Sequence, residues 1–211
     1  MKEALDYFSK MAEGQNVTPT SVKNIAANDF TSYDADFILR YSNPQTRILD
    51  LASGTGLTLN KIYNKVGKIT AVEPFESFTK FIQKSPKIEI YNQTISDFEP
   101  KEEYDILSFF GIMQFFTEEE AQKIYKKYLP ALISGGKIII KNQFGVKEDV
   151  IVSGYSEELK TEYFSHYRHL DKEMSILKQT GYKNIEAFDI YPPECNRWNN
   201  THFYAIVAEK L

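Results

Sequence analysis

Short runs of β-forming apolar residues alternate with longer amphipathic stretches along most of this chain. This alternation constrains the fold more than any other feature, because it is typical of parallel strands joined by helices that cover both faces of one sheet. The runs predict strands at 47–51, 68–72, 88–92, 104–110, 137–141, 185–190 and 202–208. Helices are expected at 57–65, 75–84, 117–128 and 171–180. The pattern predicts an α/β fold.

The chain has 211 residues and contains no linker long enough to separate two domains. We therefore expect a single domain over 1–211, with a core at 44–211 that begins after the break at Asn43-Pro44. The segment 1–43 carries apolar residues at helical spacing. It is expected either to close over a ligand site as a lid or to pack against the edge of the sheet.

Charge and composition exclude several classes of protein. The 25 Lys and Arg against 29 Asp and Glu give a net charge of −4, which argues against nucleic-acid binding through a basic face. The single cysteine, Cys195, excludes an internal disulfide and a multi-cysteine zinc site, and no metal site is predicted. The sequence shows neither a membrane-spanning apolar run nor a signal peptide at its start, so the expected location is cytoplasmic.

The turn after the first predicted strand is the first candidate site. In open α/β sheets, ligands bind beyond the carboxyl ends of the strands. Gly54 and Gly56 would let a ligand approach the backbone closely, and the following helix would present unpaired N–H groups. Taken alone, such a turn is also compatible with a purely structural role.

Two further residues favour a nucleoside ligand at this turn. Glu73 ends the second predicted strand, where a carboxylate accepts hydrogen bonds from the two hydroxyls of a ribose. Leu57 occupies the position at which a dinucleotide fingerprint requires a third small residue, and Asp50 lies at the start of the turn. A nicotinamide or flavin cofactor is therefore the less favoured alternative.

Four motifs in order resemble those of the class I S-adenosylmethionine-dependent methyltransferases. They are the glycine turn at 48–56, the second motif at 69–74, the strand-four motif at 104–107, and the Leu-x-x-Gly-Gly-x-apolar run at 132–138. The resemblance implies a Rossmann-like seven-stranded sheet with an antiparallel last strand and helices on both faces. It also implies that S-adenosylmethionine is the cofactor and methyl transfer the activity. One departure is Ala52, where the family usually has glycine, a change that is easily tolerated if φ is negative there.

The resemblance assigns roles to individual residues of the cofactor site. The turn would hold the methionine portion, Glu73 the ribose and Phe75 one face of the adenine, with Asp97 sharing contact to the adenine edge. The backbone carbonyl of Phe109 would accept from the cofactor's ammonium, although plain core packing is an equal alternative for the side chains of Phe75 and Phe109. The expected cofactor-binding residues are Asp50, Ala52, Ser53, Gly54, Gly56, Glu73, Pro74, Phe75, Thr94, Ile95 and Phe109.

Methyl transfer from a sulfonium is an in-line displacement, so the protein contributes chiefly by aligning and drying the reactants. The methyl acceptor must lie over the same strand ends. We expect it to contact Asn142, Arg197, Trp198 and His202. Arg168 and Arg197 suggest that it carries an anionic group, and His166 or His169 would serve as a general base. For both histidines a plain surface position is the alternative, and for both arginines a solvated one.

The predicted acceptor is a small molecule such as a sugar or a cell-surface precursor. Methyltransferases of exocyclic DNA amines place Asn or Asp, two prolines and an aromatic residue after strand four, where this chain has Ser108-Phe109-Phe110-Gly111. Two other functions remain open at this point: a nicotinamide-dependent oxidoreductase, and a non-catalytic partner or sensor that binds S-adenosylmethionine.

Overall fold

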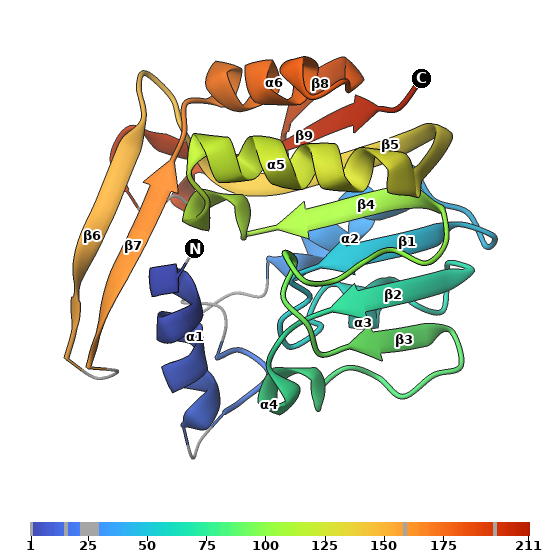
Figure 1. Cartoon of the computed structure of the whole chain (residues 1–211), viewed down its shortest axis with the longest axis horizontal. Helices are drawn as coiled ribbons and strands as arrows, with labels where there is room; N and C mark the ends of the chain where they lie inside the picture. The colour runs from blue at the N-terminus through green and yellow to red at the C-terminus, as the bar shows by residue number, and fades with distance from the viewer. Residues whose placement is uncertain (1, 15–16, 22–29, 158–159, 196–197) are drawn as a thin grey trace.

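The computed structural model describes residues 2–14, 17–21, 30–157, 160–195 and 198–211. These residues form a seven-stranded sheet in the order β3-β2-β1-β4-β5-β9-β8, and a separate two-stranded sheet of β6 and β7 (Figure 1). The strands of the large sheet are β1 Arg47–Leu51, β2 Lys68–Val72, β3 Ile88–Tyr91, β4 Tyr104–Phe110, β5 Leu132–Gly145, β8 Lys183–Asp189 and β9 Thr201–Glu209.

The parallel half of the sheet follows the predicted strands closely. On β1, Ile48 pairs with Ile69 on β2 and with Ile106 on β4. Continuous apolar runs form these strands because both faces of a parallel sheet are buried. β9 is antiparallel to both of its neighbours, β5 and β8. The prediction of a Rossmann-like sheet with an antiparallel last strand is confirmed.

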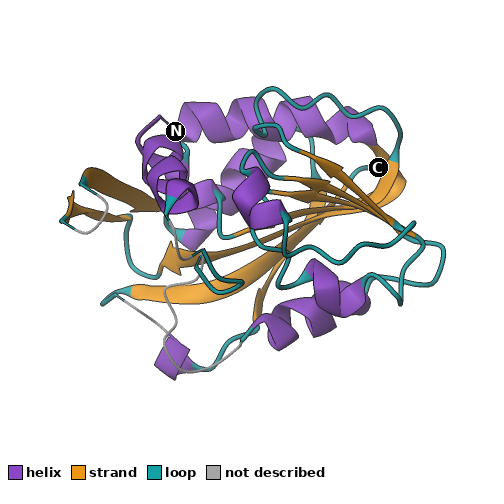
Figure 2. Ribbon diagram, turned by 90° about the horizontal axis from the view of Figure 1, so that it is seen from below, coloured by secondary structure: helices purple, strands orange, loops and turns teal. Residues whose placement is uncertain are grey.

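Helices cover both faces of the sheet, as Figure 2 shows. On one face, α2 Thr31–Leu39 and α3 Leu59–Ile62 pack on apolar side chains of β1 and β2. On the other, α5 Glu118–Tyr128 and α6 Leu170–Gln179 cover a second core. A capping box begins α5, since the side chains of Thr117 and Glu120 each accept from the other residue's backbone N–H. Gly181 ends α6 at a φ of 107°.

Two predicted helices are shorter than expected. The expected helix at 57–65 is regular only over α3, and that at 75–84 only over α4 Glu76–Thr79. The described residues also form short 3-10 turns, which are η1 Met113–Phe115, η2 Leu129–Ala131 and η3 Pro193–Cys195. Within the segment 1–43, residues 22–29 lie outside the described part of the chain, and α2 follows them.

A hairpin that the sequence did not predict projects from the carboxyl end of β5. It consists of β6 Val150–Ser156 and β7 Thr161–Tyr167, which pair antiparallel. The N-terminal helix α1 Lys2–Glu13 lies between this hairpin and the carboxyl ends of the parallel strands (Figure 1). In the described parts of the chain, no helix is long and apolar enough to cross a membrane.

Candidate active site

The turn after β1 is built from left-handed backbone. Ala52, Gly54 and Gly56 have φ values of 64°, 54° and 76°. A Cβ on Gly56 would lie 2.7 Å from Cγ1 of Ile82, so only glycine fits there without a shift. The expectation that Ala52 is easily tolerated required a negative φ, and this requirement is not met. The alanine is held in a left-handed conformation that costs an L-residue about 1 kcal/mol.

Asp50 and Ser53 fix the start of this turn. The Ser108 hydroxyl on β4 donates to Oδ1 of Asp50 at 2.6 Å, and Ser53 Oγ donates to the Asp50 carbonyl at 2.9 Å. Burial raises the pKa of the Asp50 carboxyl, partly offset by these hydroxyls. A positively charged group nearby would favour its ionised form, which fits the expected place of the cofactor's ammonium.

Glu73 closes the other side of the turn. Its Oε2 accepts from the Gly54 N–H at 3.0 Å, its Oε1 accepts from the Phe75 N–H at 3.2 Å, and the residue is only 5% exposed. Burial raises the pKa of Glu73 to about 7. A carboxylate offers about four acceptor positions. Two therefore remain after these bonds, which matches the two hydroxyls of a ribose.

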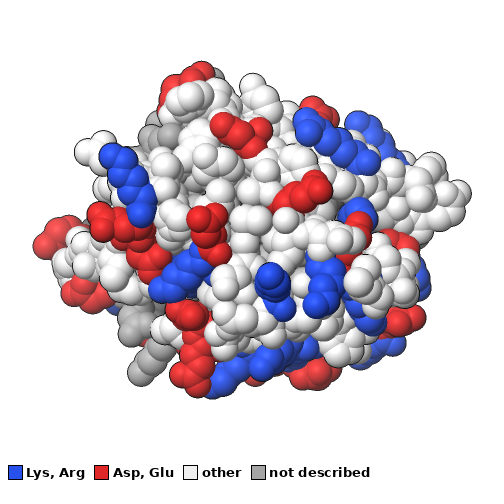
Figure 3. Space-filling model, turned by 90° about the horizontal axis from the view of Figure 1, so that it is seen from above, with Lys and Arg blue, Asp and Glu red and all other residues white. Residues whose placement is uncertain are grey.

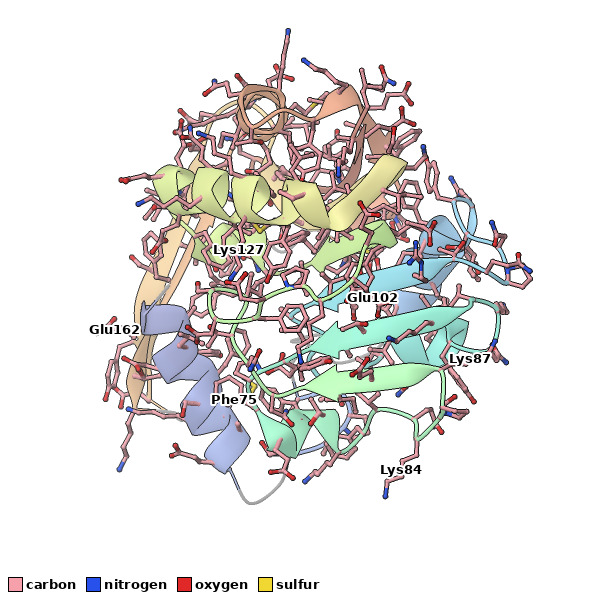
Figure 4. All side chains as sticks on the ribbon, turned by 45° about the vertical axis from the view of Figure 1, so that its right-hand side comes forward. Phe75, Lys84, Lys87, Glu102, Lys127 and Glu162 are labelled. Carbon is pink, nitrogen blue, oxygen red and sulfur yellow. The ribbon has the colours of Figure 1, made fainter. Side chains whose placement is uncertain are left out.

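The predicted adenine-binding residues surround the ends of β2 and β3. Figure 4 places Phe75 beside α1 at the carboxyl ends of these strands. Its ring packs edge-on against Phe78 with centroids 5.5 Å apart, and Pro74 beside it is half-buried. After β3, Thr94 Oγ1 donates to Oδ2 of Asp97 at 2.6 Å. Pro74 and Phe75 would offer apolar side chains, and Asp97 a carboxylate, to a purine.

Ile95 and Phe109 have core side chains. Ile95 is 4% exposed, and its carbonyl accepts from the Tyr128 hydroxyl at 2.7 Å. Phe109 is fully buried and packs edge-on against the rings of Tyr125 and Tyr128. The core-packing alternative therefore describes the Phe109 side chain, while the predicted role of its backbone carbonyl stays a prediction.

The N-terminal segment reaches both the turn and the hairpin. Thr55, within the turn, donates its hydroxyl to the carbonyl of Pro19. On α1, Phe8 packs edge-on against Phe115 of η1 at 5.4 Å, and Tyr7 packs against Tyr163 of β7 at 5.2 Å. These contacts hold α1 across the carboxyl edge of the sheet (Figure 4).

The predicted acceptor-binding residues lie at the ends of β5 and β9. Asn142 is 2% exposed on β5. His202, also largely buried, bonds to Oδ1 of Asp189 through Nε2 at 2.7 Å. Trp198 is 41% exposed and donates from Nε1 to the Tyr167 hydroxyl at 3.3 Å. The prediction for Arg197 lies outside the described residues.

His166 and His169 lie at the root of the hairpin, around Asp149. Nε2 of His166 lies 2.7 Å from Oδ2 of Asp149, whose Oδ1 accepts from the backbone N–H of His169. Nε2 of His169 lies 3.0 Å from the Val146 carbonyl. Both rings are thus tied to neighbouring groups of the junction, and their role as general base stays a prediction. Within the described residues, no three metal-binding side chains cluster.

Arg168 requires a correction. Its Nε and NH2 pair with the carboxylate of Glu173, and NH1 and NH2 donate to the carbonyls of Phe116 and Met113. The residue is 2% exposed. A guanidinium enclosed in this way cannot capture an anionic acceptor. Arg168 instead joins the start of α6 to η1.

One residue of this region was missed by sequence reasoning. Gln114 lies in η1, directly beyond the end of β4, and its Nε2 donates to the Gly111 carbonyl at 2.8 Å. Its position after a strand end was the only available signal. A lone glutamine in a short irregular segment is too common for that signal to stand out.

The sheet order, the glycine turn and the carboxylate at the end of β2 together define a class I S-adenosylmethionine-dependent methyltransferase. A model of the ribosomal RNA adenine dimethylase family matches residues 23–153, and the chain belongs to this family. S-adenosylmethionine is its cofactor and the protein is an enzyme, which removes the nicotinamide and non-catalytic alternatives.

Solved structures with similar folds share little sequence with this chain. The complex of DhpI with SAH superposes with a TM-score of 0.75 at 15% identity, covering 98% of this chain and 96% of that one. N-methyltransferase NodS from Bradyrhizobium japonicum WM9, in complex with SAH, gives 0.66 at 12% identity over 97% and 98% of the two chains. A methyltransferase from Listeria monocytogenes gives 0.67 at 14% over 86% and 98%. No curated protein sequence matches the chain significantly.

Proposed function

We propose that this enzyme transfers a methyl group to a small molecule bound over the carboxyl ends of β4 and β5, beneath α1. The observation that carries this proposal is the position of α1. It packs against Phe115 of η1 and Tyr163 of β7, whose rings lie 6.3 Å from each other, so these aromatic side chains form one cluster at the carboxyl edge of the sheet. A helix in this place would act as a lid over the strand ends and would obstruct the approach of a folded polymer.

The second candidate is methylation of an adenine in ribosomal RNA, which the name of the matched family favours. Two features weigh against it. The last three residues of β4 and the residue after it are Ser108-Phe109-Phe110-Gly111 rather than an Asn/Asp-Pro-Pro-aromatic sequence, the arrangement of exocyclic-amino DNA methyltransferases. The net charge is −4, and on the face in Figure 3 basic and acidic side chains are interspersed. The first feature argues against methylation of an exocyclic amine by that arrangement, and the second does not suit a polyanionic substrate.

The chemistry asks mainly for alignment. When bound, the cofactor supplies an activated methyl group on a sulfonium. Glu73 would hold the ribose hydroxyls, the turn at 52–56 would fix the methionine portion, and Asp50 would balance the ammonium. The apolar rings of Tyr7, Phe8 and Phe115 would exclude water, and such alignment is worth up to about 7–11 kcal/mol in favourable cases.

An anionic group on the acceptor is not part of this proposal. It depended on two arginines, of which Arg168 is enclosed by Glu173 and two backbone carbonyls. Arg197 lies outside the described residues.

Transfer of radiolabelled methyl groups tests the proposal. The enzyme is incubated with labelled S-adenosylmethionine and either an ultrafiltered small-molecule extract of bacterial cells or protein-free ribosomal RNA. We expect label in the small-molecule fraction and none in RNA. Glu73→Ala serves as the control for cofactor-dependent transfer. Label confined to RNA would replace this proposal with the second candidate.

A further inference from the structure

Two buried side-chain oxygens in the described parts of the chain have no hydrogen-bond partner: Oε1 of Gln114 and Oδ1 of Asn142. Buried polar atoms are almost always paired, so an unpaired one requires an explanation. Both are acceptors: Gln114 lies beyond the end of β4, and Asn142 lies near the carboxyl end of β5, where the proposed acceptor site is.

The two residues lie on adjoining elements. β4 and β5 pair through Phe110 and Lys141, and the next N–H along β4, that of Gly111, donates to the Lys141 carbonyl at 2.7 Å. Gln114 in turn donates to the Gly111 carbonyl, and Asn142 directly follows Lys141. Through Gly111 and Lys141, a short series of contacts therefore joins the side chain of Gln114 to the backbone of Asn142.

The strand alternation places the Asn142 side chain on the η1 side of the sheet. Its neighbours on the same face of β5, Ile140 and Phe144, belong to the core that contains Met113. Gln143 points to the opposite face, where its amide donates to Thr201. Beyond Phe110, β4 no longer pairs with β5, so Asn142 lies at the open end of this pair of strands.

The orientation of the Gln114 amide is fixed by its partner. Because the Gly111 carbonyl can only accept a hydrogen bond, the nitrogen of the amide must face it, and the oxygen must face the other way. The segment itself is held at both ends by Arg168, which donates to the carbonyls of Met113 and Phe116. Gln114 thus presents an acceptor on a firmly anchored turn.

We propose that Gln114 and Asn142 recognise the methyl acceptor by accepting hydrogen bonds from its N–H or O–H groups, so that the substrate is an amine or an alcohol. This inference rests on the proposed function. A carboxylate or phosphate would bring its oxygens against these two oxygens, which is unfavourable. In the reaction, the acceptor's lone pair forms the bond to the methyl carbon. The carbon–sulfur electron pair leaves with the sulfur, and the acceptor's proton passes to water.

The test uses shape-conserving variants that lack the acceptor atoms, Gln114→Met and Asn142→Leu, with the ultrafiltered extract as the source of substrate. Each variant should lower kcat/KM by roughly tenfold or more, since the acceptor's donor then loses its partner. SAH affinity, measured by calorimetry, should stay unchanged, and thermal stability should not fall. Asn142→Asp keeps an acceptor oxygen at this position and should recover part of the rate that is lost in Asn142→Leu. Gln179→Met, on the exposed end of α6, is the matched control.

Product analysis by tandem mass spectrometry completes the test. A methyl group on nitrogen or on a hydroxyl oxygen supports the inference, and one on a carboxylate or phosphate overturns it. Wild-type rates in both variants would also overturn it while leaving the small-molecule proposal intact. If the wild-type enzyme labels no small molecule at all, the proposed function fails first, and the inference fails with it.

Discussion

The guanidinium of Arg168 and the carboxylate of Glu173 form an ion pair in which both side chains are buried, at 1% and 0% exposure. The Tyr125 hydroxyl donates to the same carboxylate. The pair joins α6 to α5, and through the carbonyls of Met113 and Phe116 it also fixes η1. Arg168, which was predicted to lie at the surface of the substrate site, is thus buried in the core. Its contacts fix η1, which lies next to the predicted site.

Loss of Arg168 should destabilise the fold severely. Arg168→Ala leaves Glu173 buried without its counter-charge, a change that typically costs about 3–5 kcal/mol. Urea unfolding measures this free energy. Arg47→Ala is the control, because its pair with Asp105 is partly exposed and worth at most about 1 kcal/mol. Equal losses in the two variants would contradict the structural role of Arg168.

Ala52 should respond to substitution in the opposite way to an ordinary strand alanine. Ala52→Gly relieves the strain of a φ of 64°, which outweighs or balances the greater freedom of glycine in the unfolded chain. We expect a change in the free energy of unfolding between about 0 and +1 kcal/mol. Ala71→Gly, on the buried strand β2, should instead destabilise by about 1 kcal/mol. A loss of stability in both variants would show that the Ala52 backbone is unstrained.

Asp149 should stabilise the hairpin junction in a pH-dependent manner. Burial acts to raise its pKa, but hydrogen bonds from the His169 N–H, Lys172 and His166 prevail and lower the pKa from 3.8 to about 2. The stabilisation is present above pH 3.8 and is lost as the pH falls through about 2. Asp149→Asn should cost about 1–2 kcal/mol at neutral pH, discounted for partial exposure. Denaturant titrations should show that the difference in the free energy of unfolding between wild type and Asp149→Asn becomes smaller at acidic pH. A constant difference would contradict the ionic role.

Cofactor affinity should depend on the ionisation of Glu73. Its pKa is raised to about 7, and the ionised form is the one that accepts two ribose hydroxyls. SAH binding should therefore weaken as the pH falls below 7, by up to about tenfold per unit. Calorimetry across this range measures the effect. The Glu73→Gln variant should bind SAH weakly, with an affinity that does not change with pH. If its affinity changed as steeply with pH as that of the wild type, the pH dependence would belong to another group.

The same raised pKa affects the stability of the protein without cofactor. Glu73 favours the folded state fully below its ordinary pKa of 4.5, and this contribution declines as the pH rises to about 7. In the Glu73→Gln variant, the free energy of unfolding should not show this decline with rising pH. The opposite pH trends of stability and cofactor affinity are expected of a buried carboxylate kept for binding.

The parts of the fold that could be predicted were those governed by local pattern. β1, β2 and β4 have the predicted boundaries because their apolar runs are buried on both faces. The hairpin was missed because its strands are largely exposed and mix polar with apolar residues, so no strong periodicity marks them. The predicted helices at 57–65 and 75–84 were longer than the observed α3 and α4, because tertiary contacts rather than helix propensity determine where these helices end.

Within the candidate site, the glycine turn was predictable because left-handed backbone favours glycine, and the position of Glu73 was predictable because it directly follows the apolar run of β2. Arg168 was not, since its partners come from η1 and from the next helix, and their approach depends on the whole fold. The buried, unpaired side-chain oxygen of Gln114 likewise results from tertiary packing, so it could not be predicted from the residue type.

The most direct test of the central claim is a crystal structure of the enzyme with SAH. The ribose hydroxyls should lie within hydrogen-bonding distance of the Glu73 carboxylate, with the amino-acid portion against the turn at 52–56. A nucleoside bound elsewhere, with Glu73 still bonded only to Gly54 and Phe75, would contradict the site described above.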